Sequence, residues 1–445
     1  MKAVDAGRAA GRRTGSAIAV VVVAAIVAFG AQWTPARTPV SDMTPALWAE
    51  DIGWLQRHLD RKYPRVAQAV DPASLDGEFA GLVSLLPELS NLRVVMELAR
   101  IVALLGDGHT SVQLHDPPLA LPRLPLSLYF YGEELRVNFA DRSLEHLVGA
   151  RVDAIAGYAI PDLAARLTPY IAGDNAHEVA HALPMLLATP AVLEALELAP
   201  SAERLTLDLT RLDGVRDAVS VAPLPPGRSI ERVFARPDGD DAPLYVRHAD
   251  RHYWFEPIAR NRAVYVKLNV VNDQRSEPSI RSTAADIQRL VVEQTWQRMI
   301  FDLRHNTGGN FHRADPLVRV AREFAESDPG RQVFVLVSRH TYSAAMVTAM
   351  RLKAEAGAAI VGEVPRGRPN FTYNKETVNL PQSGIAVDYT DEFRTVVEQF
   401  GHGPTIALDL EVAQTFDDYR MGLDPVLEAV LVAQPVSQLA PRTVN

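Results

Sequence analysis

The amino-terminal third of the chain carries apolar residues at helical spacing. Between Trp48 and Leu105 these residues recur every three or four positions, which is the spacing of one face of an α-helix. The apolar positions include Ile52, Leu55 and Leu59, and then Leu92, Val95, Leu98 and Val102, with Leu47 just before the range. We therefore expect a region of several packed helices over residues 46–115, which contains the glycine-rich stretch GDGHTSV near its end.

The pattern changes in the next hundred residues. Between Leu124 and Val221, short β-branched and aromatic runs such as LSLYFY, LRVNF and LTLDL alternate with helical stretches. This alternation predicts a small mixed module over residues 120–222. Proline, glycine and charged residues then indicate a linker at 223–243.

The carboxy-terminal half alternates buried-strand runs with helical segments. The runs AVYVKLNVV, MIFDL, QVFVLVS and AAIVGE are separated by helical patterns such as residues 282–296 and 343–356. Strands and helices that alternate in this way predict a parallel sheet with crossover helices, here over residues 244–433. Residues 434–445 are expected to form a tail.

The first residues have the features of an export signal. Three arginines precede an uncharged run over residues 14–29, and a stretch rich in proline and threonine follows. The strongly apolar part is about 13 residues, shorter than the roughly 20 that span a bilayer, although Trp33 could extend it as an interfacial anchor. Residues 1–45 are thus predicted to be a signal peptide, or a membrane anchor at residues 14–33, plus a linker. Both alternatives place the protein outside the cytoplasm, in the periplasm or the extracellular space.

Composition excludes several classes of function. The 45 basic and 54 acidic side chains give a formal net charge of −9, and an anionic surface repels nucleic-acid phosphates. We therefore expect no nucleic-acid partner. The chain has no cysteine, which excludes disulfides, thiolate zinc sites and a cysteine nucleophile.

The first candidate for chemistry is the HEVAH segment, from His177 to His181. It matches the HExxH pattern, in which two histidines one helical turn apart bind zinc and the glutamate acts as a base. Asp174 or Asn175 would cap the helix and place His177 in its first turn. Pro184 follows closely, so little regular helix is expected to hold two ligands. We interpret the segment as the solvated start of a helix, with a zinc peptidase as the alternative.

The second candidate is Ser343 in VSRHTYSAAM, which follows a predicted strand and opens a predicted helix. A hydroxyl at a helix amino terminus lies near free N–H groups and the positive end of the helix dipole, which favour negative charge. Upstream, FDLRHNTGGN ends another strand in Gly308 and Gly309, which can direct an N–H at an oxyanion. Ser343 is therefore a candidate nucleophile. The simpler alternative for Ser343 alone is a helix N-cap.

A serine nucleophile needs a base, and the chain offers few candidates. Lys353 lies on the same predicted helix, roughly 15 Å away at 1.5 Å per residue, and is too distant. Arg366 and Arg368 stay protonated, whereas Lys375, on a later loop or hairpin, remains a candidate. His109, in the GDGHT loop, has the small neighbours of a site loop and is the remaining candidate base.

Six stretches occur in order and together carry a family resemblance. They are GDGHTSV (106–112), FDLRHNTGGN (301–310), VSRHTYSAAM (337–346), IVGEVPRGRPN (360–370), LPQSGIAV (380–387) and GLDPVLEAVL (422–431). As an ordered set they resemble the S41 peptidases, the tail-specific and tricorn-like serine proteases, over nearly everything from Trp48 to Ala433. The resemblance implies an α/β fold with a ClpP/crotonase-like core, an amino-terminal helical cap and a PDZ-like middle module.

The resemblance also implies roles for individual residues. Ser343 matches the family nucleophile, and the N–H groups of Gly308 and Ala344 match its oxyanion hole. In this scheme His109 takes the proton of Ser343, and water later releases the acyl-enzyme.

The resemblance distinguishes two branches of the family. The branch with a serine–lysine dyad places its lysine where this chain has Arg366 and Arg368, whereas His109 matches the histidine of the tricorn-like branch. The acid that orients this histidine stays open between two candidates. Glu398 fits by position, and Glu363 lies in the better-matched VGE segment.

The sequence thus predicts an exported or membrane-anchored serine endopeptidase. Its substrate would be a peptide or an unfolded protein, and no metal or organic cofactor is required. Two alternatives from other classes remain: a binding protein without proteolytic activity on the same fold, and a zinc peptidase that uses the HEVAH segment.

Overall fold

The helices expected near the amino terminus are present in the computed structural model, and each begins at a capping residue. Thr44, Asp71 and Ser90 each accept a hydrogen bond from the backbone N–H three residues further on. The three helices are α1 (Pro45–Lys62), α3 (Pro72–Leu85) and α4 (Asn91–Ala103). The structure describes residues 37–63, 70–225, 227–293, 295–370 and 372–432.

An antiparallel sheet follows, in the strand order β2-β3-β4-β6-β7. Buried and more exposed residues alternate along its strands, as in β6, where Leu205, Leu207 and Leu209 are buried. The strands are β2 (Leu126–Tyr131), β3 (Glu134–Asp141), β4 (Arg151–Ile155), β6 (Leu205–Thr210) and β7 (Arg216–Val221), with the short β5 (Tyr158–Ala159) paired to β4. The helices between β5 and β6 are α5 (Ile160–Leu167), α6 (Ala176–Leu187) and α7 (Pro190–Ala195).

The predicted linker at 223–243 contains a strand of this sheet. Strand β8 (Arg232–Phe234) pairs with β3, with Phe234 opposite Phe139. The rings of these two residues lie 5.4 Å apart. A run of three residues is too short to show the alternation that predicts a strand. The strand conformation of β8 is therefore set by its pairing with β3.

A six-stranded sheet forms the carboxy-terminal half, in the order β16-β13-β12-β11-β10-β9. All its pairings are parallel except that of β9 with β10. All six residues of β10 are buried, as expected for a parallel sheet covered on both faces. The strands are β9 (Tyr253–Ile258), β10 (Ala263–Leu268), β11 (Arg298–Asp302), β12 (Gln332–Val337), β13 (Ala359–Gly362) and β16 (Leu410–Glu411). The prediction of a parallel sheet with crossover helices is confirmed.

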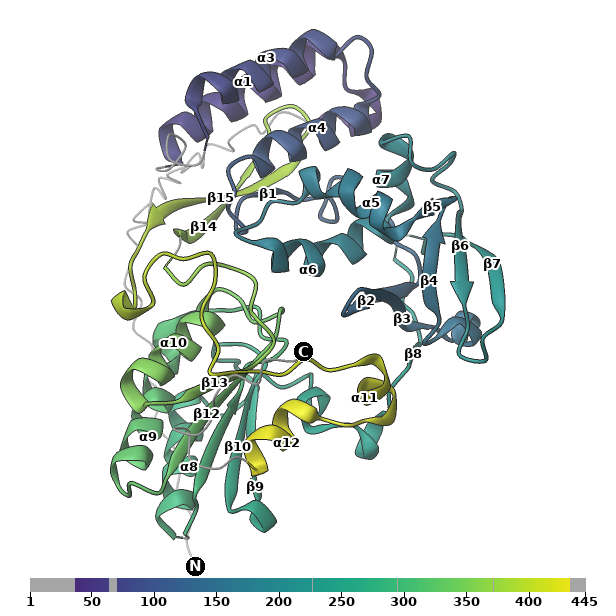
Figure 1. The fold of residues 1–445 in the computed structure, drawn as a ribbon. Helices are drawn as coiled ribbons and strands as arrows, with labels where there is room; N and C mark the ends of the chain where they lie inside the picture. The colour runs from purple at the N-terminus through teal and green to yellow at the C-terminus, as the bar shows by residue number, and fades with distance from the viewer. Residues whose placement is uncertain (1–36, 64–69, 226, 294, 371, 433–445) are drawn as a thin grey trace, which may run out of the picture. The chain divides into compact units, whose positions relative to one another are not determined.

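Helices cover both faces of this sheet (Figure 1). Three crossover helices pack on one face, and the last helix packs on the other. They are α8 (Ile280–Glu293), α9 (Asp315–Glu326) and α10 (Ala344–Ala356) on the first face, and α12 (Pro425–Val432) on the second. Helix α11 (Phe416–Met421) precedes α12 and packs against Tyr131 instead. Because parallel strands end at one edge, the loops after β11 and β12 meet there, where α/β proteins bind ligands.

A small third sheet joins distant parts of the chain. Strand β15 (Ala386–Phe393) pairs with β14 (Thr372–Asn379) on one side and with β1 (Ser111–Val112) on the other. In this register Val112 lies opposite Val387 and Ser111 lies opposite Asp388. The stretch that follows α4 is thereby fixed to a strand from the carboxy-terminal part.

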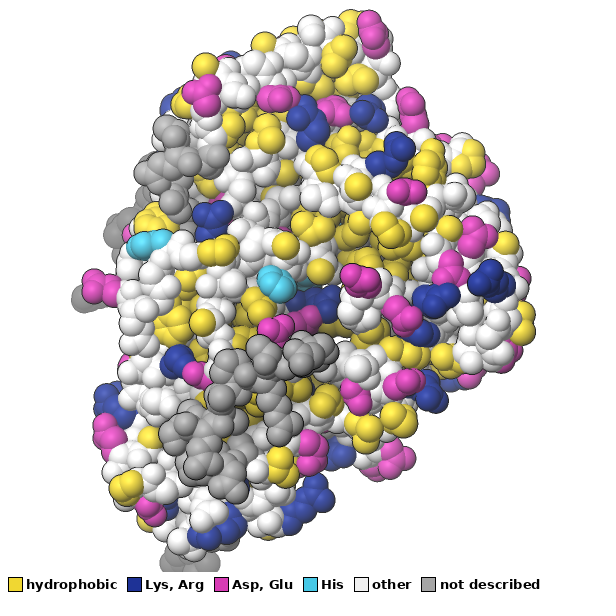
Figure 2. Space-filling model, in the orientation of Figure 1, with side chains coloured by type: hydrophobic (Ala, Val, Ile, Leu, Met, Phe, Trp, Pro, Cys, Tyr) yellow, Lys and Arg dark blue, Asp and Glu magenta, His cyan; other side chains and the backbone are white. Residues whose placement is uncertain are grey.

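The predicted α/β class is confirmed, with helices and several sheets in the described part of the chain. None of the helices in the described ranges combines the length and apolar character needed to cross a bilayer. The predicted signal or anchor (14–33) and the predicted tail (434–445) lie outside the described residues. On the face seen in Figure 2, lysines and arginines lie among aspartates and glutamates rather than in one continuous patch.

Candidate active site

Ser343 lies in the turn between strand β12 and helix α10. Its backbone has φ 52° and ψ −125°, a conformation rare for any residue with a side chain and costing about 1–3 kcal/mol. Ser343 stands at the N-cap position, yet its side chain makes no capping hydrogen bond to the described residues of the helix. The simpler alternative of a serine that only caps the helix is therefore wrong. A strained serine between a strand and a helix is the geometry of a nucleophile elbow.

Gly308 packs directly against Ser343 because it has no side chain. A Cβ atom on Gly308 would lie 2.9 Å from Cβ of Ser343, 3.3 Å from its Oγ and 3.2 Å from the amide nitrogen of Ala344. The Ala344 amide is the first of α10, where N–H groups lack an acceptor within the helix. The Gly308 amide donates a hydrogen bond to Oδ1 of Asn306 at 2.9 Å. A substrate oxyanion would therefore compete with Oδ1 of Asn306 for the hydrogen bond from the Gly308 N–H.

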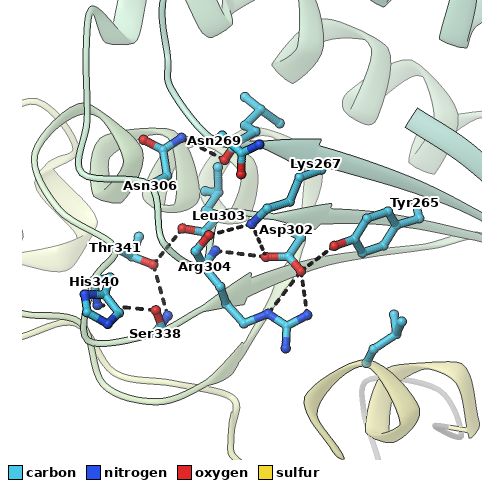
Figure 3. A network of polar contacts seen from close by, with 12 residues as sticks. Tyr265, Lys267, Asn269, Asp302, Leu303, Arg304, Asn306, Ser338, His340 and Thr341 are labelled. Carbon is cyan, nitrogen blue, oxygen red and sulfur yellow. Dashed lines mark hydrogen bonds and ion pairs between the residues drawn. The ribbon is translucent and has the colours of Figure 1, made fainter. Parts of the chain in front are cut away.

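Asn306, labelled in Figure 3, ties three backbone segments together around the glycine loop. Its Nδ2 donates to the carbonyl of Leu268 at 3.0 Å, and its Oδ1 accepts the Gly308 amide. Its own carbonyl accepts the amide of Tyr342 at 3.1 Å. Asn306 is fully buried, so water does not compete for these bonds. Asn306 thus sets the glycine loop against the serine turn through both its side chain and its backbone carbonyl.

A buried ionic network supports the same loop from the strand ends (Figure 3). Asp302 accepts hydrogen bonds from the hydroxyl of Tyr265 at 2.6 Å and from Nζ of Lys267 at 3.1 Å. Arg304 binds Asp302 and also forms two bonds to Asp424, at 2.7 and 2.8 Å. Burial would raise the pKa of Asp302, but the charges of Arg304 and Lys267 hold it well below its usual value.

Sequence reasoning missed this network. The available signal was the spacing of Asp302, Arg304 and Asn306, three polar residues two positions apart at the end of a buried strand. Residues at this spacing share a side of an extended chain. Polar groups repeated at a buried strand end indicate partners elsewhere in the fold.

Asp107 holds the loop that carries His109. Its Oδ1 accepts the backbone N–H of His109 at 3.0 Å, and its Oδ2 accepts the hydroxyls of Thr110 and Thr390, each at 2.7 Å. Thr390 belongs to β15, so these bonds fix the loop to the small sheet. Burial would raise the pKa of Asp107, but its interactions with His109 and Thr110 lower it to about 2. Asp107 is a site residue that sequence reasoning missed.

The imidazole of His109 contacts the residue that precedes Ser343. Nδ1 of His109 lies 2.8 Å from the hydroxyl oxygen of Tyr342 and 3.8 Å from Oδ1 of Asp107. The rings of His109 and Tyr342 are stacked, with centroids 4.5 Å apart and an interplanar angle of 26°. The hydrogen bond and the stack together attach the GDGHT loop to the serine turn.

One cavity of about 720 Å³ joins the two predicted catalytic residues. Its lining includes His109, Ser343 and Ala344, together with Gly309 from the glycine pair. This volume lies within the range of ligand and substrate sites, which is roughly 300–1,000 Å³. The structure therefore brings together a histidine and a serine from distant parts of the chain, around a space that a substrate can enter.

Comparisons with known proteins identify the fold. No protein-family model matches the chain, and no curated protein matches its sequence. Mature CPAF matches with a TM-score of 0.63 at 15% sequence identity, over 89% of this chain and 98% of CPAF. The chain has the fold of CPAF. CPAF complexed with lactacystin gives a TM-score of 0.63 and 15% identity, over 89% and 99% of the two chains.

A further match is the photosystem II D1 C-terminal processing protease, at 16% identity over 90% of this chain and 99% of that chain. Its TM-score is 0.41, so the assignment of the fold rests on CPAF. The match to CPAF, at 15% identity, shows the fold of the chain. The roles of single residues rest on the geometry of the site.

The two candidate acids lie elsewhere in this CPAF fold. Glu363 follows β13 and accepts a hydrogen bond from Nε of Arg339 at 2.7 Å. Glu398 opens a 3₁₀ helix (Glu398–Phe400) and lines a separate cavity of about 590 Å³. Neither is among the described residues that line the cavity of His109 and Ser343.

The lysines are engaged by carboxylates. Nζ of Lys375, on β14, lies 2.7 Å from Oδ2 of Asp388, and Nζ of Lys353 lies 2.6 Å from Oδ1 of Asp409. His109 and Lys375 both line the cavity of Ser343, but the amine of Lys375 is engaged by the carboxylate of Asp388.

The HEVAH segment differs from its prediction. Asn175 caps α6 as expected, but the helix continues through Pro184 to Leu187, so both histidines lie on regular helix. Glu178 is only 3% exposed and forms an ion pair with Arg366. The interpretation as a solvated helix start is therefore wrong, because tertiary packing buries this face. The described ranges contain no group of three or more histidine, aspartate or glutamate side chains arranged to hold a metal ion.

Proposed function

We propose that this chain is a serine endopeptidase of the S41 type. The observation that carries the proposal is the cavity shared by His109 and Ser343. The strained backbone of Ser343, with no capping bond to the described helix residues, is the second support. The fold of CPAF agrees with this activity.

In the proposed mechanism, His109 takes the proton of Ser343 as Oγ attacks the peptide carbonyl. The N–H of Ala344, at the start of α10, stabilises the oxyanion. The N–H of Gly308 becomes the second donor by exchanging Asn306 for the oxyanion. Loss of one such donor typically costs about 10²- to 10³-fold in turnover. The amine leaves with the proton from His109, and water then releases the acyl-enzyme.

The substrate is proposed to be a peptide or an unfolded protein. The architecture is proposed to consist of a helical cap (46–115), a PDZ-like module (120–222) and a ClpP/crotonase-like core (244–433). The proposed chemistry requires no metal or organic cofactor.

Export is a separate part of the proposal, and it rests on the sequence of residues 1–45. The basic residues and the short apolar run favour a signal peptide or an anchor at residues 14–33. The mass of the mature chain recovered from expressing cells distinguishes cleavage from anchoring. Full-length chain in the cytosolic fraction would count against both.

The test compares Ser343→Ala and His109→Ala with the wild-type full chain. Both variants are expected to lose cleavage of an unstructured peptide by at least about 10³-fold, because either change removes the nucleophile–base pair. Ser343→Ala also loses labelling by a fluorophosphonate probe. Circular dichroism confirms that each variant is folded. The matched controls are Ser282→Ala and His146→Ala, both exposed and outside the site.

Two results of the labelling and cleavage tests would contradict the proposal, and they have different meanings. Labelling or cleavage that survives Ser343→Ala would assign the nucleophile elsewhere. A folded wild-type chain that neither reacts with the probe nor cleaves any peptide would favour the binding protein without proteolytic activity.

A further inference from the structure

Two buried carboxylates lie beside the site without a part in the chemistry described so far. Asp174, just before α6, is 8% exposed, and Glu178, in the first turn of that helix, is 3% exposed. Within the described part of the chain, Oδ2 of Asp174 and Oε2 of Glu178 have no hydrogen-bond partner. A buried oxygen without a partner costs on the order of 1–3 kcal/mol. Such a cost at two neighbouring residues indicates a functional arrangement.

Both oxygens face the space that Gly108 leaves open beside Tyr342. A Cβ atom on Gly108 would lie 3.2 Å from Oε2 of Glu178, 3.3 Å from Oδ2 of Asp174 and 2.5 Å from the hydroxyl oxygen of Tyr342. The hydroxyl and the two carboxylate oxygens therefore converge on one small space. The same hydroxyl lies 2.8 Å from Nδ1 of His109. Tyr342 thus stands between the imidazole and the carboxylates.

The proton positions follow from the chemistry of His109. To take a proton from Ser343 on Nε2, the neutral imidazole must carry its own proton on Nδ1. The oxygen of Tyr342 then accepts this Nδ1–H, so its own hydroxyl proton is directed away from His109. The free oxygens of Asp174 and Glu178 border the same small space as this hydroxyl. Burial, together with the charges of Asp174 and Glu178, raises the pKa of Tyr342 well above its usual value. The tyrosine therefore keeps its proton.

We propose that Tyr342 is the positioning residue of His109 and that it couples the carboxylates of Asp174 and Glu178 to the imidazole through its hydroxyl. The inference rests on the proposed function. As Oγ of Ser343 bonds to the substrate carbonyl carbon, its proton moves to Nε2 of His109. The Nδ1 proton stays on His109 and the hydroxyl proton stays on Tyr342. The tyrosine hydroxyl is the nearer partner of Nδ1, at 2.8 Å, whereas Oδ1 of Asp107 lies 3.8 Å from it.

The surrounding charges fit this arrangement. Arg366 lies over the Tyr342 ring at 4.2 Å and pairs with Glu178, while Arg368 lies 3.7 Å from Asp174. Burial and the charge of Asp107 raise the pKa of Asp174 to about 7. A raised pKa means that burial destabilises the charged form of this carboxylate, and a hydrogen bond donated by a hydroxyl stabilises that form.

The first experiment uses Tyr342→Phe in the full chain. Phenylalanine keeps the ring that stacks on His109 and removes only the hydroxyl. We expect kcat on an unstructured peptide to fall by about 10²-fold with KM within about twofold, because the imidazole loses its orientation but the substrate still binds. The acid limb of the pH profile should also move. The control is Tyr131→Phe, which removes a tyrosine hydroxyl bonded to Asn138 at 2.8 Å.

A second experiment tests the coupling to the carboxylates. Asp174→Asn alone should lower kcat by about 10-fold, and it should add little to Tyr342→Phe, because the carboxylate acts through the hydroxyl. If Asp174 had a purely structural role, Asp174→Asn would lower kcat by the same factor in the wild type and in Tyr342→Phe. Additive effects would overturn the coupling.

A third measurement uses the unmodified protein and does not depend on how the variants fold. Nitrogen-15 NMR of histidine-labelled protein, with His109→Gln for assignment, should show the neutral ring protonated on Nδ1. Protonation on Nε2 would overturn the inference, as would a Tyr342→Phe variant with wild-type kcat and pH profile. In both cases the wild-type enzyme still cleaves and labels. Failure of the wild type to do either would instead overturn the proposed function.

Discussion

Close contact between Gly308 and Ser343 makes a sharp prediction at the scale of single residues. Gly308 has φ +126°, which residues with a side chain rarely adopt. A methyl group there would approach Cβ of Ser343 to 2.9 Å, well inside van der Waals contact. We expect Gly308→Ala to move the serine turn and to reduce peptide cleavage by at least about 10²-fold, which steady-state kinetics measures.

The control for this prediction is Gly132→Ala. Gly132 also has a positive φ, of 61°, but open space surrounds its Cβ position. This change should cost about 1 kcal/mol of stability without affecting cleavage. Equal activity of the two variants would show that the contact between Gly308 and Ser343 does not matter to the reaction.

Some residues of the candidate site could be predicted from local sequence, and others could not. Ser343 and His109 stand out because glycines or a strand–helix boundary mark their loops. Tyr342 carries no such signal, and the sequence assigned Asp174 to a helix cap and Glu178 to a zinc-binding pattern. Their arrangement around Tyr342 exists only after α6 packs against the serine turn. The HEVAH segment shows the same limit, because its glutamate is buried by an arginine from a distant loop.

At the scale of elements, Asn175 fixes helix α6 to the carboxy-terminal half. Its Oδ1 accepts the amide of His177 at 2.9 Å, and its Nδ2 donates to the carbonyls of Gly367 at 3.2 Å and Pro404 at 2.8 Å. We expect Asn175→Ala to lower the free energy of unfolding by about 2–3 kcal/mol, because it removes a cap and two further hydrogen bonds. Urea denaturation measures this change.

Two comparisons separate these contributions. Ser90→Ala removes only the cap of α4, a single bond to Arg93, and should cost about 1 kcal/mol. Asn175→Asp keeps the cap acceptor and loses the two donors, so its effect should lie between those of the two alanine variants. If Asn175→Ala were no worse than Ser90→Ala, the bonds to Gly367 and Pro404 would contribute nothing to stability.

The elements themselves were predicted where their patterns are long. The parallel strands show continuous apolar runs, and the amino-terminal helices show periodic apolar positions with capping residues. Strand β8 was not predicted because three residues give no period. The length of α6 was not predicted because Pro184 is buried within the helix and does not end it. In each case tertiary contacts override the local preference.

At the scale of the whole molecule, two histidines link the middle of the chain to the carboxy-terminal sheet. His181, on α6, and His340, in the loop after β12, have ring centroids 4.9 Å apart in an edge-to-face arrangement. Burial lowers the pKa of His181 to about 2, and nearby Arg366 adds to this effect. Burial and Arg366 likewise lower the pKa of His340 to about 3. Both imidazoles are therefore neutral in the folded protein at mildly acidic pH.

This neutrality predicts how stability depends on pH. In the unfolded chain a histidine has a pKa of about 6.5, so below that pH the unfolded state binds more protons than the folded state. The contribution of each histidine to the free energy of unfolding is fully present above about pH 6.5. It is lost as the pH falls toward the pKa that the histidine has in the folded protein, by at most about 1.4 kcal/mol per pH unit. Asp174, whose pKa is raised to about 7, acts in the opposite direction, so a variant is needed to isolate the histidines.

His340→Phe is that variant, because it keeps an aromatic ring against His181 and removes one titrating group. Between about pH 7 and about pH 4.5, the wild type should lose stability relative to this variant in urea denaturation. His146→Gln, at an exposed position, should stay parallel to the wild type over the same range. If the stability of His340→Phe also ran parallel to that of the wild type, His340 would become protonated in the folded state as easily as in the unfolded chain. The contact between α6 and the loop after β12 would then contain water and would not bury a neutral pair of imidazoles.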